Sequence, residues 1–141
     1  MSNPEIEEIG RLLVQLVRDE AIQSCDRNLR PAAKGFVADR WRSLGPENSV
    51  DTVARTLIPD IVDDTLWQLM RALDEGTFPL SFTASNGKTV DLTKNGELMG
   101  WYAGQDWLAE YSRERFVDDY ADLRSEPLQR RFPPPAPENR E

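Results

Sequence analysis

One stretch of the sequence decides the fold: Ile58-Pro59-Asp60-Ile61-Val62-Asp63-Asp64-Thr65-Leu66-Trp67-Gln68-Leu69-Met70-Arg71-Ala72-Leu73-Asp74-Glu75-Gly76. Apolar side chains recur in it at steps of three and four, the spacing of one helical face, at positions 58, 62, 66, 69, 70 and 73. Pro59 suits the first helical position, and Gly76 suits the left-handed residue that ends a helix. We therefore predict a helix that begins at Pro59 and packs its apolar face beneath the segment that follows.

Three carboxylates open this predicted helix, namely Asp60, Asp63 and Asp64. The first turn favours anions because the helix dipole is positive there. The residues before Pro59 are predicted to form a separate short helix from Ser49 to Leu57, capped by Ser49 or Asn48.

The pattern after Gly76 changes to the alternation that is typical of strands, in residues 78–83 and 89–92. A two-residue turn would put Phe82 opposite Asp91 and place the apolar sets on opposite faces. A three-residue turn of Ser85, Asn86 and Gly87 pairs Phe82 with Val90 and keeps one apolar face. We therefore predict a type I turn with a bulge, in which Gly87 is left-handed.

Helices are predicted on both sides of this central region. Asn3 and Pro4 begin a first helix, which breaks near Pro31, and a second helix runs through Ala33 and Trp41 to Gly45. Residues 97–111 are predicted to form one or two short helices, and residues 112–117 a last helical turn or two. The fold class is thus α+β, a mostly helical single domain over residues 1–126 with one antiparallel hairpin, which a third strand could extend. Residues 127–141 are Pro-rich and predicted to be extended or disordered.

Composition excludes several classes of function. The 141 residues are 39% hydrophobic and 30% charged, with no apolar run of membrane-spanning length and no basic-then-apolar leader. We therefore expect a cytoplasmic protein that does not enter membranes. Histidine is absent and Cys25 is the single cysteine, which removes Ser-His and Cys-His nucleophile pairs, disulfides and thiolate zinc clusters. We expect no cofactor.

The net charge of −8 is unevenly spread along the chain. Residues 47–75 have a net charge of −5 and residues 101–126 one of −4, whereas residues 76–100 are balanced. Acidic segments of this kind repel phosphate backbones, so we expect no binding to nucleic acid. A basic protein or a divalent cation is the better match.

The first candidate site is a cluster of carboxylates on the predicted central helix. Asp60, Asp63 and Asp64 have a spacing that could hold Mg²⁺, and Glu5 and Glu8 of the first helix could join them. A second cluster has the D-D-x-x-D order of prenyl-diphosphate enzymes, which are larger all-helical proteins: Asp118, Asp119 and Asp122. The structural interpretation, which we favour for both, is that the first cluster stabilises a helix start and the second is a solvated face.

The second candidate site is an aromatic group with acids between its members: Trp101, Tyr102, Asp106, Trp107, Glu110 and Tyr111. Exposed aromatics beside acids could anchor a basic protein, since Trp, Tyr and Arg dominate interface hot spots. The alternative is that these rings close the core over the hairpin. In the tail, the run from Arg131 to Pro135 could dock into an aromatic groove as an extended ligand, or simply be a disordered end. Cys25 is expected to be buried and unreactive.

Four segments together resemble a pattern found in small uncharacterised bacterial proteins: residues 58–64, 80–92, 96–101 and 112–116. In size, acidity and lack of catalytic residues the chain is also similar to bacterial immunity proteins, which neutralise a cognate toxin. That similarity implies a non-enzymatic protein that occludes a basic site of its partner. The binding residues would be Trp101, Tyr102, Asp106, Trp107, Glu110, Tyr111, Asp118 and Asp119. The alternatives are a Mg²⁺-dependent hydrolase of a phosphorylated small molecule that uses Asp60, Asp63 and Asp64, and a subunit of a larger assembly.

Overall fold

The computed structural model describes residues 3–123, and the predicted tail at 127–141 lies outside them. The fold class is α+β, mostly helical with one antiparallel hairpin, as predicted. Within the predicted domain the chain forms two compact units, which divide after Gly96. We call residues 3–96 the helical unit and residues 97–123 the C-terminal unit. Among the described residues, no helix combines the length and hydrophobicity that crossing a bilayer requires.

The first helix of the helical unit runs from Pro4 to Asn28 in three segments, α1 (Pro4–Leu12), the π-helical segment η1 (Leu13–Arg18) and α2 (Asp19–Asn28). Asn3 caps it as predicted, because its side chain accepts hydrogen bonds from the N–H groups of Glu5 and Ile6. In η1 the hydrogen bonds span five residues, as between the N–H of Asp19 and the carbonyl of Val14. The π segment therefore adds one residue to a turn of an otherwise regular helix.

The central helix α4 spans Val50–Glu75 without interruption, so the prediction of two helices separated at Pro59 is wrong. Ser49 caps its start and Gly76 ends it with φ 80°, both as predicted. A proline inside a helix removes one backbone hydrogen bond, but contacts of the next residue, Asp60, fix the helix immediately after it. Asp60, Asp63 and Asp64 consequently lie in the middle of α4, and their predicted role in a first turn is wrong.

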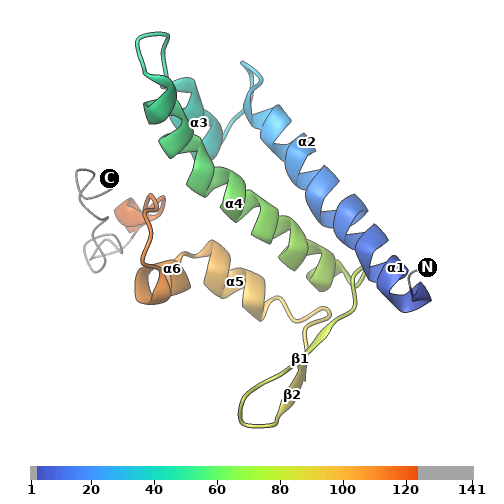
Figure 1. The fold of residues 1–141 in the computed structure, drawn as a ribbon. Helices are drawn as coiled ribbons and strands as arrows, with labels where there is room; N and C mark the ends of the chain where they lie inside the picture. Colours follow the sequence, from blue (N-terminus) through green and yellow to red (C-terminus); the bar gives the residue numbers. More distant parts are fainter. Residues whose placement is uncertain (1–2, 124–141) are drawn as a thin grey trace. The chain divides into compact units, whose positions relative to one another are not determined.

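Helix α4 packs against η1 and α2, and the short helix α3 (Phe36–Arg42) contacts both α2 and α4 (Figure 1). Ala33, which we predicted to lie in that second helix, precedes it. The core of this unit consists of Val17, Ala21, Ala38, Trp41, Met70, Ala72, Leu73 and Phe78. Only part of the predicted apolar face of α4 is in this core, because Ile58, Val62 and Leu66 are exposed. The face of α4 that meets the other helices carries Asp60 and Asp64 instead.

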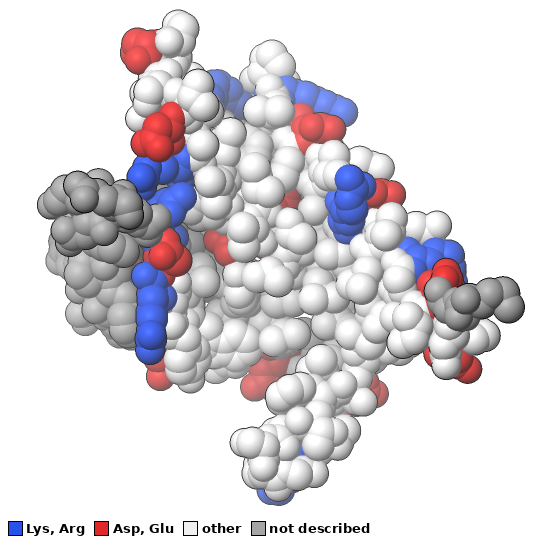
Figure 2. Space-filling view, in the orientation of Figure 1, with Lys and Arg blue, Asp and Glu red and all other residues white. Residues whose placement is uncertain are grey.

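The hairpin consists of β1 (Ser81–Thr83) and β2 (Thr89–Asp91), and its register is the predicted one. Phe82 pairs with Val90, and Gly87 has φ 86° in a turn closed by its N–H bond to the carbonyl of Ala84. Every residue of both strands is exposed, so the prediction that the hairpin packs on the central helix is wrong for the strands. Figure 2 shows an almost uncharged surface on the projecting hairpin, since between Ser81 and Asp91 only Lys88 and Asp91 itself are charged.

The base of the hairpin, in contrast, is fixed to the end of α4. Phe78 is 1% exposed, and its N–H donates to the carbonyl of Ala72. On the return path the N–H of Lys94 donates to the carbonyl of Leu73 at 3.1 Å. The helix therefore supports the two ends of the hairpin, while the paired strands extend away from it.

The C-terminal unit contains α5 (Glu97–Ala103), α6 (Asp106–Tyr111) and the 3₁₀ turn η2 (Ala121–Leu123). One or two short helices over residues 97–111 were predicted, and the structure contains two. The predicted helical turn over residues 112–117 is wrong, because the chain is irregular there. The hydroxyl of Ser112 accepts a hydrogen bond from the N–H of Glu114, a local bond that competes with helix formation.

Candidate functional site

The carboxylates of α4 are used inside the helical unit. The two oxygens of Asp60 accept hydrogen bonds from Arg40 at 2.7 and 3.0 Å, and Oδ2 also accepts one from Trp41 Nε1 at 2.8 Å. The Arg40 and Asp60 side chains are 18% and 11% exposed. Asp60 is therefore the acceptor of a mostly buried ion pair that joins α3 to α4.

Asp64, one turn further along α4, interacts with α2. Its carboxylate accepts hydrogen bonds from the thiol of Cys25 at 3.5 Å and from Gln68 at 3.2 Å. Asp63 is only partly buried on the same helix. Glu8 precedes Cys25 by 17 residues on one continuous helix, which places it roughly 25 Å from this position. Glu5 and Glu8 thus do not join the aspartates, and no group of three potential metal ligands occurs in residues 3–123.

The surroundings of the Cys25 thiol disfavour its thiolate form. Partial burial, followed by the negative charge of Asp64 and the hydrogen bond to it, raises the pKa of Cys25 from 9.0 to about 11. The sequence predicted a buried, unreactive thiol, and the structure shows one that is partly buried and protonated at neutral pH.

This raised pKa gives a first testable prediction. At neutral pH the folded protein should contain about a hundredfold less Cys25 thiolate than the unfolded chain, and iodoacetamide should alkylate it correspondingly more slowly. Asp64→Asn should accelerate alkylation without reaching the unfolded rate, because burial is the larger cause. Since the folded pKa is raised, stability should also fall as the pH rises from about 9 to about 11. Equal alkylation rates in native buffer and in denaturant would contradict this assignment.

The aromatic residues of the C-terminal unit are only partly buried, and they lie on two adjacent short helices. Trp101 of α5 stacks on Trp107 of α6, with ring centroids 6.3 Å apart and an interplanar angle of 13°. Trp101 is 47% exposed and Tyr111 is 69% exposed. The alternative in which these rings close a core is therefore wrong for Trp101 and Tyr111, whereas Tyr102 and Trp107 are half-buried.

An open hollow of about 550 Å³ lies between these side chains, lined by Tyr102, Trp107, Leu108, Tyr111 and Ser112. Asp106 and Glu110 are exposed on the same helix that supplies most of the lining. The described part of this unit contains seven acidic residues and two arginines, a net charge of −5. We call these side chains, Trp101, Tyr102, Asp106, Trp107, Glu110 and Tyr111, the aromatic–acidic surface.

The two further predicted binding residues differ in their surroundings. Asp118 is 8% exposed, and its carboxylate accepts a hydrogen bond from the N–H of Tyr120, so the expectation of an exposed charge at Asp118 is wrong. Asp119 is partly buried, and its N–H donates to the side chain of Gln105. Because Asp118 is buried, the acidic run at 118–122 is not a uniformly solvated face.

Gln105 holds the C-terminal unit together, a role that sequence reasoning missed. It connects α5 to α6 with φ 70°, and it is 9% exposed. Its side-chain N–H donates to the carbonyl of Val117 at 2.7 Å, and its side-chain oxygen accepts from the N–H of Asp119 at 3.0 Å. These two bonds tie the irregular segment after α6 to the turn between the helices, beside the buried Ala109 and Phe116. The glutamine thereby fixes the segment that follows α6 to the junction of the two helices that carry the aromatic–acidic surface.

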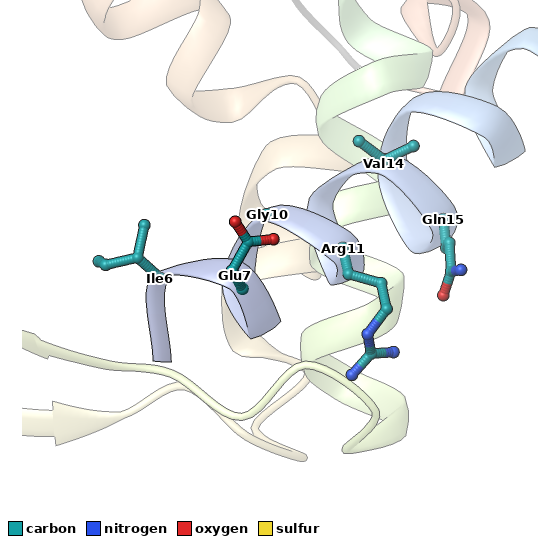
Figure 3. A pocket seen from close by; sticks show the side chains of 6 residues that line it. All are labelled: Ile6, Glu7, Gly10, Arg11, Val14 and Gln15. Carbon is teal, nitrogen blue, oxygen red and sulfur yellow. The ribbon is translucent and has the colours of Figure 1, made fainter. Parts of the chain in front are cut away.

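A second hollow, of about 360 Å³, lies on the first helix and is lined by Ile6, Glu7, Gly10, Arg11, Val14 and Gln15. Figure 3 shows these side chains spaced along one face of a single helix around Gly10, which contributes none. Its two charges have opposite sign and come from exposed residues. This hollow therefore lacks the converging polar groups that characterise a small-molecule site.

Comparison of the chain with family models, with curated proteins and with solved structures finds no match.

Proposed function

We propose that the protein is a non-enzymatic binding module that recognises a basic protein through its aromatic–acidic surface. One observation carries the proposal. The half-exposed Trp101 of α5 stacks on Trp107 of α6 beside an aromatic-lined hollow, and α6 also carries the exposed carboxylates of Asp106 and Glu110. Tryptophan and tyrosine, with arginine, are the side chains that most often dominate binding energy at interfaces.

The arrangement suits a cationic side chain of the partner. Lysine or arginine is attracted to the face of a tryptophan or tyrosine ring, and the attraction grows when the contact excludes water. Asp106 and Glu110 would pair with basic groups around such a contact. A net charge of −5 on the described part of this unit would also accelerate the encounter with a basic protein.

The specific form that we propose is an immunity protein, which neutralises a cytoplasmic toxin by covering its basic active site. The hydrolase alternative has less support, because Asp60 is already paired with Arg40 and Trp41. Asp63 and Asp64 also gain no third metal-ligating side chain, since no group of three or more Asp, Glu, His or Cys residues that could hold a metal ion occurs in residues 3–123.

The proposal predicts a large effect of two exposed aromatics. The partner is first captured from a lysate of the host at low salt and then purified. We expect Trp101→Ala combined with Tyr111→Ala to weaken its binding at least about thirtyfold, equivalent to about 2 kcal/mol, in isothermal titration calorimetry. The matched control is Phe82→Ala, which removes an aromatic of similar exposure (56%) from the hairpin of the other unit. Equal losses in the double variant and the control would contradict the proposed surface.

The electrostatic part is tested separately with the same purified pair. Raising the ionic strength from low to physiological should slow association strongly and change dissociation little. For the immunity role, the partner expressed alone should arrest growth, and co-expression of the wild-type chain but not of the double aromatic variant should restore it. A partner that binds but is harmless when expressed would support a binding module and reject the immunity role.

A further inference from the structure

The hollow of the aromatic–acidic surface has the lining that recognises polyproline segments. Domains that bind such segments present grooves walled by tyrosine and tryptophan, with acidic side chains that pair with a flanking arginine. Here Tyr102, Trp107 and Tyr111 line the hollow, and Asp106 and Glu110 are exposed on α6. A proline-rich ligand with adjacent arginines would thus match the aromatic lining of the hollow and the charge beside it.

The chain itself contains a segment of this chemistry beyond the described residues. Residues 130–135 read Arg-Arg-Phe-Pro-Pro-Pro, which joins three consecutive prolines to an aromatic residue and two arginines. Arg130 and Arg131 are the single pair of directly adjacent basic residues in the sequence. The described part of the C-terminal unit has a net charge of −5, opposite in sign to this pair.

The segment is close enough along the chain to reach the hollow. Arg131 follows Leu123, the last described residue, by eight positions, and eight residues of extended chain span about 25 Å. A compact unit of roughly 27 residues has a radius of gyration of about 8 Å, so this span reaches across it. A tethered ligand at this separation has an effective concentration on the order of 1 mM. Even a weak segment with a dissociation constant of about 100 μM would therefore occupy the hollow about nine-tenths of the time.

We propose that residues 130–135 of this chain dock into the hollow lined by Tyr102, Trp107 and Tyr111, with the arginines paired to Asp106 and Glu110. The docked segment covers the aromatics that would contact a partner, so binding of the partner requires its release. This regulatory consequence rests on the proposed function, whereas the docking itself does not.

The test uses the full chain and the indole N–H signals of its four tryptophans in ¹H–¹⁵N spectra. Trp101 and Trp107 report on the hollow, and Trp41 and Trp67 of the helical unit are internal controls. Arg131→Glu should move the Trp107 signal, and with it that of Trp101, by several line widths and leave the other two in place. The matched control is Arg140→Glu, which makes the same change of charge in the tail outside the docking segment. A synthetic peptide of residues 127–137 added to the Arg131→Glu variant should return the signals toward their original positions.

Each outcome decides the proposal without any partner protein. Docking within one chain is supported if the indole signals of Trp101 and Trp107 move in Arg131→Glu but not in Arg140→Glu, and if the shift does not depend on protein concentration. No movement, or equal movement in Arg140→Glu, overturns it. Signals that shift with protein concentration overturn it as well, because the occupant would then be a second copy. If a basic partner is found, Arg131→Glu should tighten its binding about tenfold, since the competing segment is released.

Discussion

Asp60→Ala should lower the free energy of unfolding of the protein by about 3–5 kcal/mol, which is the largest effect expected of any charged residue described here. The substitution removes the carboxylate that accepts hydrogen bonds from Arg40 and Trp41, in a place where the Arg40 and Asp60 side chains are 18% and 11% exposed. The guanidinium of Arg40 then loses the Asp60 carboxylate in a site that water reaches poorly. Denaturant titration followed by circular dichroism at 222 nm measures the change, because the helical unit supplies most of the helix.

Two further variants separate the causes. Asp60→Asn keeps an oxygen acceptor but removes the charge, and it should give an intermediate loss. Glu75→Ala breaks an exposed ion pair with Arg71 on the same helix, and it should change stability by less than about 0.5 kcal/mol. If Asp60→Ala were as mild as Glu75→Ala, the buried contact between α3 and α4 would not exist in solution.

Gln105→Ala should destabilise the C-terminal unit by about 2–4 kcal/mol, because it leaves the carbonyl of Val117 and the N–H of Asp119 without this side chain as a partner. Hydrogen exchange of the Asp119 amide measures the change locally.

Gln105→Gly loses the same two hydrogen bonds but relieves the strain of the left-handed backbone, and it should destabilise the unit by about 1 kcal/mol less. Lys94→Gly is the matched control, since Lys94 has φ 58° and is exposed, and it should be neutral or stabilising. A protected Asp119 amide in Gln105→Ala would refute the role assigned to the glutamine.

Local rules predicted much of the backbone. The helix start at Asn3, the helix end at Gly76 and the pairing of Phe82 with Val90 all follow from neighbours within a few residues. Turn geometry and the alternation of side chains leave a single register for such a hairpin, because a shift by one residue would move every side chain of a strand to the opposite face of the sheet.

Long-range contacts decided what these rules could not. Pro59 signals a helix start, yet the contacts of Asp60 with Arg40 and Trp41, about 20 positions away in the sequence, accompany a helix that continues through it. The same contacts turn an apparent acidic patch into an internal ion pair. No sequence motif identifies a glutamine that bonds to a distant backbone. The one signal for the role of Gln105 was its position between Gly104 and Asp106, at the junction of two short helices.

For the candidate surface, the sequence supplied the residue types but not their exposure. The aromatic spacing predicted that Trp101, Trp107 and Tyr111 belong together, and the structure places Trp101 against Trp107 and Tyr111 beside the hollow. Whether such rings face water depends on how much other surface covers them, which short-range periodicity does not encode. Asp118 illustrates the same limit, because it looks like a surface charge in the sequence and is buried in the structure.

The π-helical segment Leu13–Arg18 sets the direction in which the second half of the first helix faces. If the same residues were wound as regular α-helix, every later residue would rotate by about 100° around the axis, so Cys25 would turn away from Asp64 and Ala21 would leave the core. Because the wide turn holds one extra residue, deleting one residue within it would instead leave a continuous α-helix whose later residues face nearly as before. In the history of such a gene, a single-codon deletion in this segment would be tolerated, whereas one in α2 ahead of Cys25 would not.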